Sequence, residues 1–67
     1  MMFQNIKEGD VVLLENGSRE IITQVGNSLF MSDEGGWFFS GKPLAGRKEP
    51  GGVIKILKKE EYPEEYL

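Results

Sequence analysis

Turn-forming residue pairs divide this chain at close intervals and confine its apolar residues to short runs. Clear examples are Asn16-Gly17, Gly26-Asn27 and Gly35-Gly36. Glycine and asparagine tolerate the positive φ that tight turns require. Turn signals spaced about 8 to 12 residues apart are typical of small barrels and sandwiches. The spacing therefore predicts an all-β chain.

The apolar runs between the turns are the expected strands. Residues 11–15 and 18–25 flank Asn16-Gly17, the strongest short-range hairpin signal in the chain. Residues 28–32, 37–40 and 53–58 supply three more. Closure into a barrel removes exposed strand edges, and a sandwich would need more strands than 67 residues allow. We predict a single domain over residues 1–67, a small five-stranded β-barrel.

Two segments do not fit a regular strand. Residues 41–52 contain four glycines and two prolines, which exclude a regular helix or a central strand. A connection of this length is usually functional or mobile. The acidic tail, residues 60–67, either remains extended or forms one helical turn after Pro63, because proline is favoured at the first helical position.

Most of the expected strands are apolar on both faces, whereas the interior of a barrel accepts only one face. Strict alternation places Ile21, Thr23 and Val25 on one face, and Ile54 on the same face as Ile56. The outward apolar set must be covered by the N-terminal lead-in, the tail, a second copy or a partner. A second copy is the simplest cover, so we expect a homo-oligomer, with a dimer favoured.

The aromatic run at residues 37–39 has two interpretations. As core residues, alternate rings fill the barrel; as a binding surface, exposed rings dock a peptide or stack on bases. Three consecutive strand positions cannot all point inward, so at least one ring faces outward. The candidate protein-binding residues are the aromatic side chains of this run and of the tail: Trp37, Phe38, Phe39, Tyr62 and Tyr66.

The net charge of -3 conceals an uneven distribution. Residues 1–41 carry two basic and six acidic side chains, a surface that could meet a basic partner. Residues 42–59 carry six basic side chains and one acidic, and the last eight residues add four glutamates. The candidate contacts to phosphate or to an acidic protein surface are the basic residues of the second region: Lys42, Arg47, Lys48, Lys55, Lys58 and Lys59.

Catalytic chemistry has little support in the sequence. The chain has no histidine and no cysteine, the side chains most used as base and nucleophile. The serines therefore have no histidine to activate them, and no carboxylate calcium loop or P-loop is present. We expect no enzymatic activity, no metal and no cofactor. No stretch resembles a signal peptide or approaches the ~20 apolar residues of a membrane span, so we expect a cytoplasmic location and no membrane partner.

The opening stretch Glu8-Gly9-Asp10-Val11-Val12-Leu13-Leu14-Glu15-Asn16-Gly17 resembles the first hairpin of SH3-like barrels. With the aromatic mid-strands and the final Val53-Ile54-Lys55-Ile56 strand, it is similar to small SH3-like proteins of bacteriophages and prophages. Gly9, Asp10 and Gly17 also match the KOW motif of ribosomal and transcription-elongation proteins. Arg19-Glu20-Ile21-Ile22 departs from that motif, which usually has a basic residue and a further glycine there.

Three functional hypotheses follow. The first is a non-catalytic protein-binding module, which the resemblance extends to a phage or prophage product that modulates a host protein. The second is a nucleic-acid-binding SH3-like module that uses the basic residues of the region 42–59. The third is a structural subunit of a larger assembly.

Overall fold

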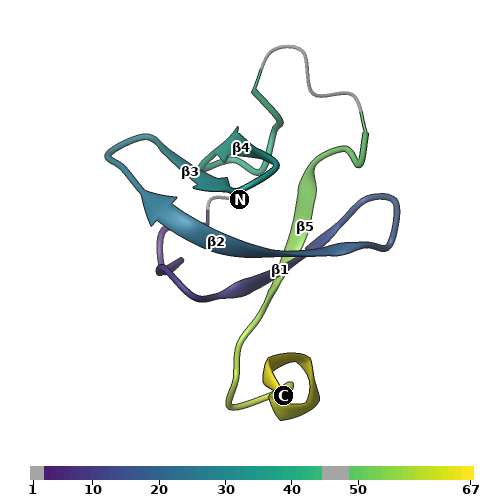
Figure 1. Cartoon of the computed structure of the whole chain (residues 1–67). Helices are drawn as coiled ribbons and strands as arrows, with labels where there is room; N and C mark the ends of the chain where they lie inside the picture. Colours follow the sequence, from purple (N-terminus) through teal and green to yellow (C-terminus); the bar gives the residue numbers. More distant parts are fainter. Residues whose placement is uncertain (1–2, 45–48) are drawn as a thin grey trace.

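The longest strand, β2 (Arg19–Val25), belongs to both halves of a five-stranded antiparallel sheet (Figure 1). The computed structural model describes residues 3–44 and 49–67. Its other strands are β1 (Val11–Leu14), β3 (Leu29–Ser32), β4 (Gly35–Phe38) and β5 (Val53–Leu57). The strand order is β4-β3-β2-β1-β5, and the sheet curls into a half-barrel. The prediction of a small all-β barrel with five strands is confirmed.

A β-bulge in β2 lets this strand turn from one half of the sheet to the other. Ile22 pairs with Ser32 while Gln24 pairs with Met31, so Thr23 is the extra residue. Ahead of the bulge, Ile22 is in the core and 1% exposed, whereas Ile21 is 60% exposed. The prediction that Ile21, Thr23 and Val25 share a face is wrong, because the bulge reverses the alternation and brings Val25 against the core.

A second bulge, in β5, also reverses the alternation of inward and outward side chains. Leu14 pairs with Val53 and Leu13 pairs with Lys55, which leaves Ile54 without a partner on β1. Val53 is buried, Ile54 is 55% exposed, and Ile56 packs against the core. The prediction that Ile54 and Ile56 share a face is therefore also wrong.

The core fills the concave side of the half-barrel. Phe30 lies at its centre, with ring centroids 5.7 Å from Trp37 and 6.1 Å from Phe39. Ile6 of the N-terminal lead-in joins this cluster and is buried. Complete burial of a large apolar side chain stabilises the fold by about 1.5–3 kcal/mol. The side chains that are less than 2% exposed come from four of the strands: Trp37, Phe30, Leu14, Ile22 and Val12.

The described parts of the segment between β4 and β5 lie against the sheet. Pro43 forms a β-bridge with Trp37, the N–H of Phe38 donates to the Lys42 carbonyl (2.9 Å), and the N–H of Leu44 donates to the Gly36 carbonyl (3.0 Å). Residues 42–44 therefore cover the outer edge of β4. After the undescribed residues 45–48, a cis peptide bond joins Glu49 to Pro50, and the chain enters β5.

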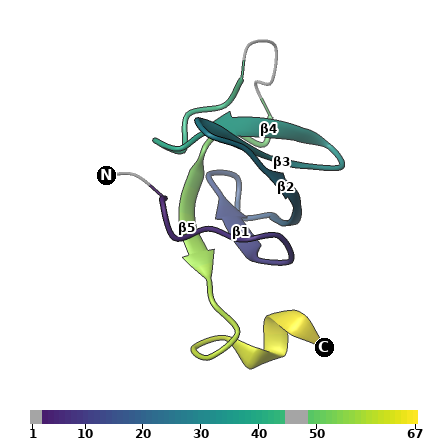
Figure 2. The same ribbon diagram turned by 90° about the vertical axis from the view of Figure 1, so that its left-hand side faces the viewer.

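The C-terminal tail covers the outward face of β1 and β5. It contains the 3-10 helix η1 (Pro63–Tyr66), which lies at the end of the molecule opposite β3 and β4 (Figure 2). The Tyr66 hydroxyl accepts from the Val11 N–H (3.0 Å) and donates to the Leu57 carbonyl (2.5 Å). Val11 and Leu57 are 4% and 3% exposed, although they point away from the core cluster. The tail therefore covers part of the apolar side chains that face away from the core.

No helix in the part of the chain that the structure describes is long and apolar enough to cross a membrane.

Candidate functional site

The five aromatic candidates do not lie on one surface. Trp37 is fully buried, and its indole N–H donates to the Gly51 carbonyl (3.0 Å). Phe39 is half-buried against Phe30, while Phe38 is 44% exposed on the outward face of β4. Tyr62 and Tyr66 belong to the tail, at the opposite end of the molecule. Phe38 is therefore the candidate in the aromatic run that is placed to meet a partner.

The tail tyrosines make contacts within the chain. Tyr66 joins the ends of β1 and β5, and the Tyr62 hydroxyl accepts a hydrogen bond from Lys55, whose ammonium lies 4.9 Å from the ring centroid. That hydrogen bond raises the pKa of Lys55 above its ordinary value. Because the pKa is raised on folding, the stabilisation is complete below the ordinary pKa and is lost as the pH rises through the folded-state value.

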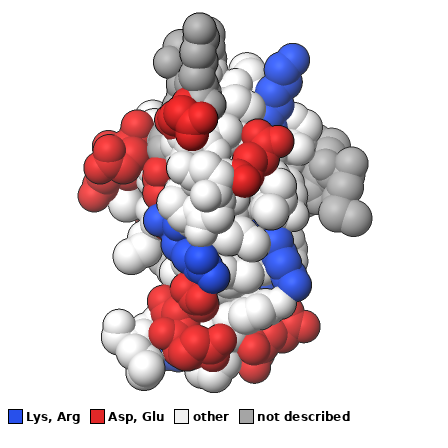
Figure 3. Space-filling view, turned by 90° about the vertical axis from the view of Figure 1, so that its right-hand side faces the viewer, with Lys and Arg blue, Asp and Glu red and all other residues white. Residues whose placement is uncertain are grey.

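The basic candidates are spread over the molecule. Lys58 forms an ion pair with Asp10 (2.8 Å) and donates to the Asn5 carbonyl (2.9 Å). Lys42 follows β4 and Lys59 follows β5; both are exposed. On the face in Figure 3, lysine and arginine side chains are separated by carboxylates and uncharged residues. Arg47 and Lys48 lie outside the described residues.

The outward face of β3 and β4 carries an apolar patch, here called the β3–β4 strip: Leu29, Met31, Phe38 and Leu44. Leu29 lies opposite Phe38, and Met31 lies opposite Gly36. Phe30 and Trp37 alternate with these residues and are buried, so the strip residues on the strands point away from the core.

Gly36 keeps the β3–β4 strip continuous. A β-carbon on this residue would lie 2.9 Å from Met31 Cγ and 3.0 Å from Leu44 Cδ1, closer than ordinary van der Waals contact. The absence of a side chain therefore lets Met31 and Leu44 approach each other across the sheet surface.

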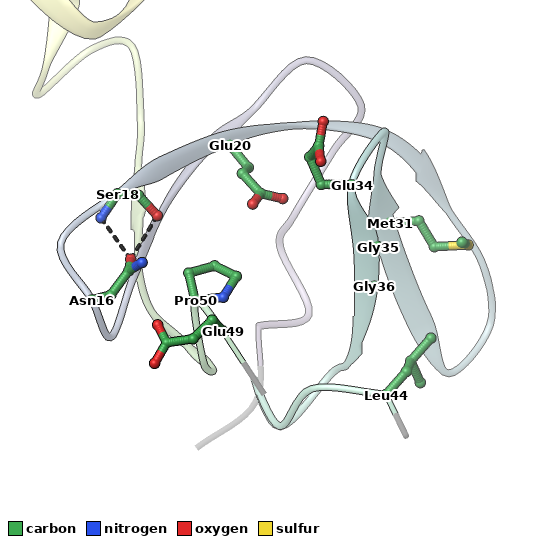
Figure 4. A pocket seen from close by; sticks show the side chains of 10 residues that line it. All are labelled: Asn16, Ser18, Glu20, Met31, Glu34, Gly35, Gly36, Leu44, Glu49 and Pro50. Atoms are coloured by element: carbon green, nitrogen blue, oxygen red, sulfur yellow. Dashed lines mark hydrogen bonds between the residues drawn. The ribbon is translucent and has the colours of Figure 1, made fainter. Parts of the chain in front are cut away.

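An open cleft of about 760 Å³ adjoins the strip, and we call it the acidic cleft. Figure 4 shows Glu20 reaching into it from β2, with Pro50 on the facing side, whereas the Glu34 and Glu49 carboxylates point away from the hollow and Met31 and Leu44 lie on the far side of the β3–β4 ribbon. The lining residues come from four parts of the chain: Asn16, Ser18, Glu20, Met31, Glu34, Gly35, Gly36, Leu44, Glu49 and Pro50. Met31 and Leu44 thus belong both to this lining and to the strip.

Backbone contacts hold the wall formed by residues 49–52. The N–H of Asn16 donates to the Pro50 carbonyl (3.2 Å), and that of Glu15 donates to the Gly52 carbonyl (3.0 Å). The Glu15 carboxylate accepts from the Gly52 N–H (2.6 Å). On the opposite wall, Ser32 Oγ donates to Glu20 (2.5 Å) and so orients that carboxylate. The cleft is therefore built on fixed backbone rather than on free side chains.

A second hollow of about 470 Å³ lies between the β3–β4 turn and the tail, and Glu20 and Glu34 line both hollows. Its lining includes the exposed Ile21. Arg19, which also lines it, is paired with Glu65 of the tail (3.3 Å).

The sequence analysis missed the strip and the carboxylates of the acidic cleft. Leu29 and Met31 could have been found, because they alternate with Phe30 in a short predicted strand. Leu44 and Glu49 could not, because they lie in an irregular segment whose path depends on contacts with β4 and β1. Among the described residues, no group of three acidic side chains is arranged to hold a metal ion.

Comparisons of the chain with protein families, with curated proteins and with solved structures found no match.

Proposed function

We propose that the chain is a non-catalytic protein-binding module that holds a segment of a partner protein along the β3–β4 strip. The observation that carries this proposal is the continuous outward apolar surface formed by Phe38, Leu29, Met31 and Leu44, next to an open cleft. Exposed apolar surface with a polar border is typical of interaction sites. Phe38 is the expected anchor, because aromatic residues that become buried on binding dominate the energy of many interfaces.

The rest of the outward apolar surface supports this location. Val11 and Leu57 are covered by the tail, so they are not free to meet a partner. Ile21 and Ile54 are exposed, but neither belongs to the strip. The strip thus combines the exposed Phe38 with the half-buried Leu29, Met31 and Leu44 on one face of the sheet.

The resemblance of the first hairpin to phage and prophage SH3-like proteins extends the proposal to a modulator of a host protein. The nucleic-acid alternative receives less support, because Lys58 is engaged by Asp10 and the Asn5 carbonyl, and because carboxylates separate the basic side chains on the face in Figure 3.

Selection from a random peptide library, followed by NMR mapping of a selected peptide on the full chain, tests the proposal. We expect shifts at the backbone amides of Leu29, Gly36, Phe38 and Leu44. Phe38→Ala should weaken binding about ten-fold, since it removes the aromatic anchor. Ile54→Ala is the matched control, because Ile54 is 55% exposed and lies on β5.

Selected peptides that shift the tail or the lysine-bearing segments, and not the strip, would refute the proposal. Light scattering over a concentration series tests whether a second copy of the chain occupies the strip. A dimer that Phe38→Ala dissociates would place a second copy of the chain on the strip in place of a foreign partner.

A further inference from the structure

We infer that the outward face of β1, β2 and β5 is an interface between copies of this chain, on which the tail of one copy docks to the sheet of another. This face is separate from the β3–β4 strip, so the inference does not rest on the proposed function. Val11 of β1 lies directly opposite both Ile21 of β2 and Leu57 of β5. The three apolar side chains therefore form a row across three strands, here called the outer row. The tail covers Val11 and Leu57, whereas Ile21 remains exposed.

A second row of side chains beside the outer row matches the chemistry of the tail. Leu13 lies opposite Arg19 of β2 and Lys55 of β5, on the same side of the sheet as the outer row, because side chains two residues apart in a strand share a face. Glu65 of the tail pairs with Arg19 (3.3 Å), and Tyr62 accepts a hydrogen bond from Lys55. The face thus presents two cations to a segment with four glutamates and two tyrosines, so the tail of a second copy is the partner that it fits.

The tail is attached to this face mainly by one side chain. All of η1 lies within the described residues, and none of its side chains is buried. The ion pair and the lysine–tyrosine hydrogen bond are exposed contacts, which contribute little to stability. Tyr66 is the anchor, because its hydroxyl accepts from the Val11 N–H and donates to the Leu57 carbonyl. Local opening of such a segment requires less free energy than unfolding of the sheet.

The segment that joins β5 to the tail is suited to act as a hinge. Residues 59–61 are exposed, and the N–H groups of Glu61 and Tyr62 donate to the Lys58 carbonyl (3.0 and 2.8 Å), which closes a turn. Lys58 itself is held by Asp10 (2.8 Å), so the chain pivots after this residue. The contacts described above all join the tail to the sheet, and a tail from another copy can therefore make the same ones. Such exchange of an identical element is a low-cost route to a dimer.

The tether between the sheet and the tail sets the concentration at which copies exchange tails. A short linker holds its own tail at an effective concentration on the order of 1 mM. Docking within one chain therefore predominates at micromolar concentration, and exchange between two copies begins in the millimolar range. In either arrangement Val11 and Leu57 remain covered by a tail, so the exchange exposes no further apolar surface.

A variant that lacks Glu60 and Glu61 tests the inference, because the shortened hinge loses the turn that returns the tail to its own sheet. Light scattering over a concentration series should show dimers at a concentration about ten-fold lower than in the wild type. Addition of Tyr66→Ala should return this variant to a monomer, whereas addition of Phe38→Ala should leave the dimer intact. Glu60→Gln/Glu61→Gln is the matched control, since it removes the same two charges, keeps the length of the hinge and should associate as the wild type does.

A second measurement applies if the deletion variant does not fold. A synthetic peptide of residues 59–67 is titrated into the labelled chain carrying Tyr66→Ala and followed by NMR. The backbone amides of Val11, Ile21 and Leu57 should shift. The same peptide with Tyr66→Phe should bind about five-fold more weakly, because the two backbone groups lose the hydroxyl between them.

A folded deletion variant that stays monomeric at about 1 mM would overturn the inference, and so would a tail peptide that leaves the outer row unshifted. A dimer that persists with Tyr66→Ala, or one that Phe38→Ala dissociates, would place the contact on another surface and have the same consequence.

Discussion

At Gly41, both the backbone conformation and the surrounding atoms require a residue without a side chain. Its φ is 92°, which favours glycine, and a β-carbon there would lie 2.7 Å from Phe3 Cε2 and 2.7 Å from the Val53 carbonyl oxygen. Its own carbonyl accepts from the Val53 N–H (2.9 Å). Gly41 therefore brings the lead-in, the end of the β4 region and the start of β5 into one contact.

We predict that Gly41→Ala destabilises the fold more than Gly17→Ala does. Gly17 has nearly the same φ, 89°, but nothing lies within 4 Å of an added β-carbon. Gly17→Ala should therefore lose only the conformational preference, about 1 kcal/mol, and Gly41→Ala should lose about 1–3 kcal/mol more through overpacking. Urea unfolding of both variants measures the difference, and equal losses would show that the Phe3 contact is not rigid.

At the scale of elements, the tail acts as a cover for β1 and β5. The Tyr66 hydroxyl takes the place of a direct bond between the Val11 N–H and the Leu57 carbonyl at the end of the β1–β5 ladder. The Arg19–Glu65 ion pair and the Lys55–Tyr62 hydrogen bond add exposed contacts, and such contacts contribute little to stability. The position of the tail therefore depends mainly on Tyr66.

We predict that Tyr66→Phe lowers the free energy of unfolding by about 1–3 kcal/mol, because two partly buried backbone groups lose their partner. Tyr62→Phe removes an exposed hydroxyl and serves as the matched control, with a loss below about 0.5 kcal/mol. Hydrogen exchange at Val11 should accelerate in the first variant alone. A negligible effect of Tyr66→Phe would mean that Val11 and Leu57 bond directly once the hydroxyl is gone.

At the scale of the whole molecule, β2 couples the two halves of the sheet. It pairs with β1 on one side and β3 on the other, and Ile22 at its bend is 1% exposed within the shared core. A core of this size is marginal, so neither half has enough buried apolar surface to remain folded alone. Unfolding should therefore be a single cooperative transition.

Two probes test this cooperativity. The single tryptophan, Trp37, reports on the β3–β4 half by fluorescence, while far-UV circular dichroism reports on the whole sheet. We predict coincident midpoints, and we predict that Ile22→Val lowers both together by about 1 kcal/mol of stability. Separate midpoints, or a shift in one signal alone, would show that the halves unfold independently.

Local sequence was enough to predict that five strands form, because strands depend on short-range preferences, but the position of the fourth was wrong: Gly35-Gly36, expected as a turn, belong to β4 and the turn lies at Asp33-Glu34. Asn16-Gly17 places the first hairpin, and short apolar runs supply the strands. For the tail, the structure shows the helical turn beginning at Pro63, one of the two alternatives that the sequence left open. Alternation within residues 37–39 also required one ring to face outward, and Phe38 does so.

The tertiary structure alone decided which faces are buried and where the candidate site lies. Bulges at Thr23 and Ile54 reversed the expected alternation, since a bulge depends on the register with the neighbouring strand. The acidic cleft is lined by Glu20, Glu34 and Glu49, which are far apart in the sequence. Sequence periodicity describes one strand at a time, whereas register, tail docking and the cleft arise from contacts between strands, and these exist only once the sheet has curled.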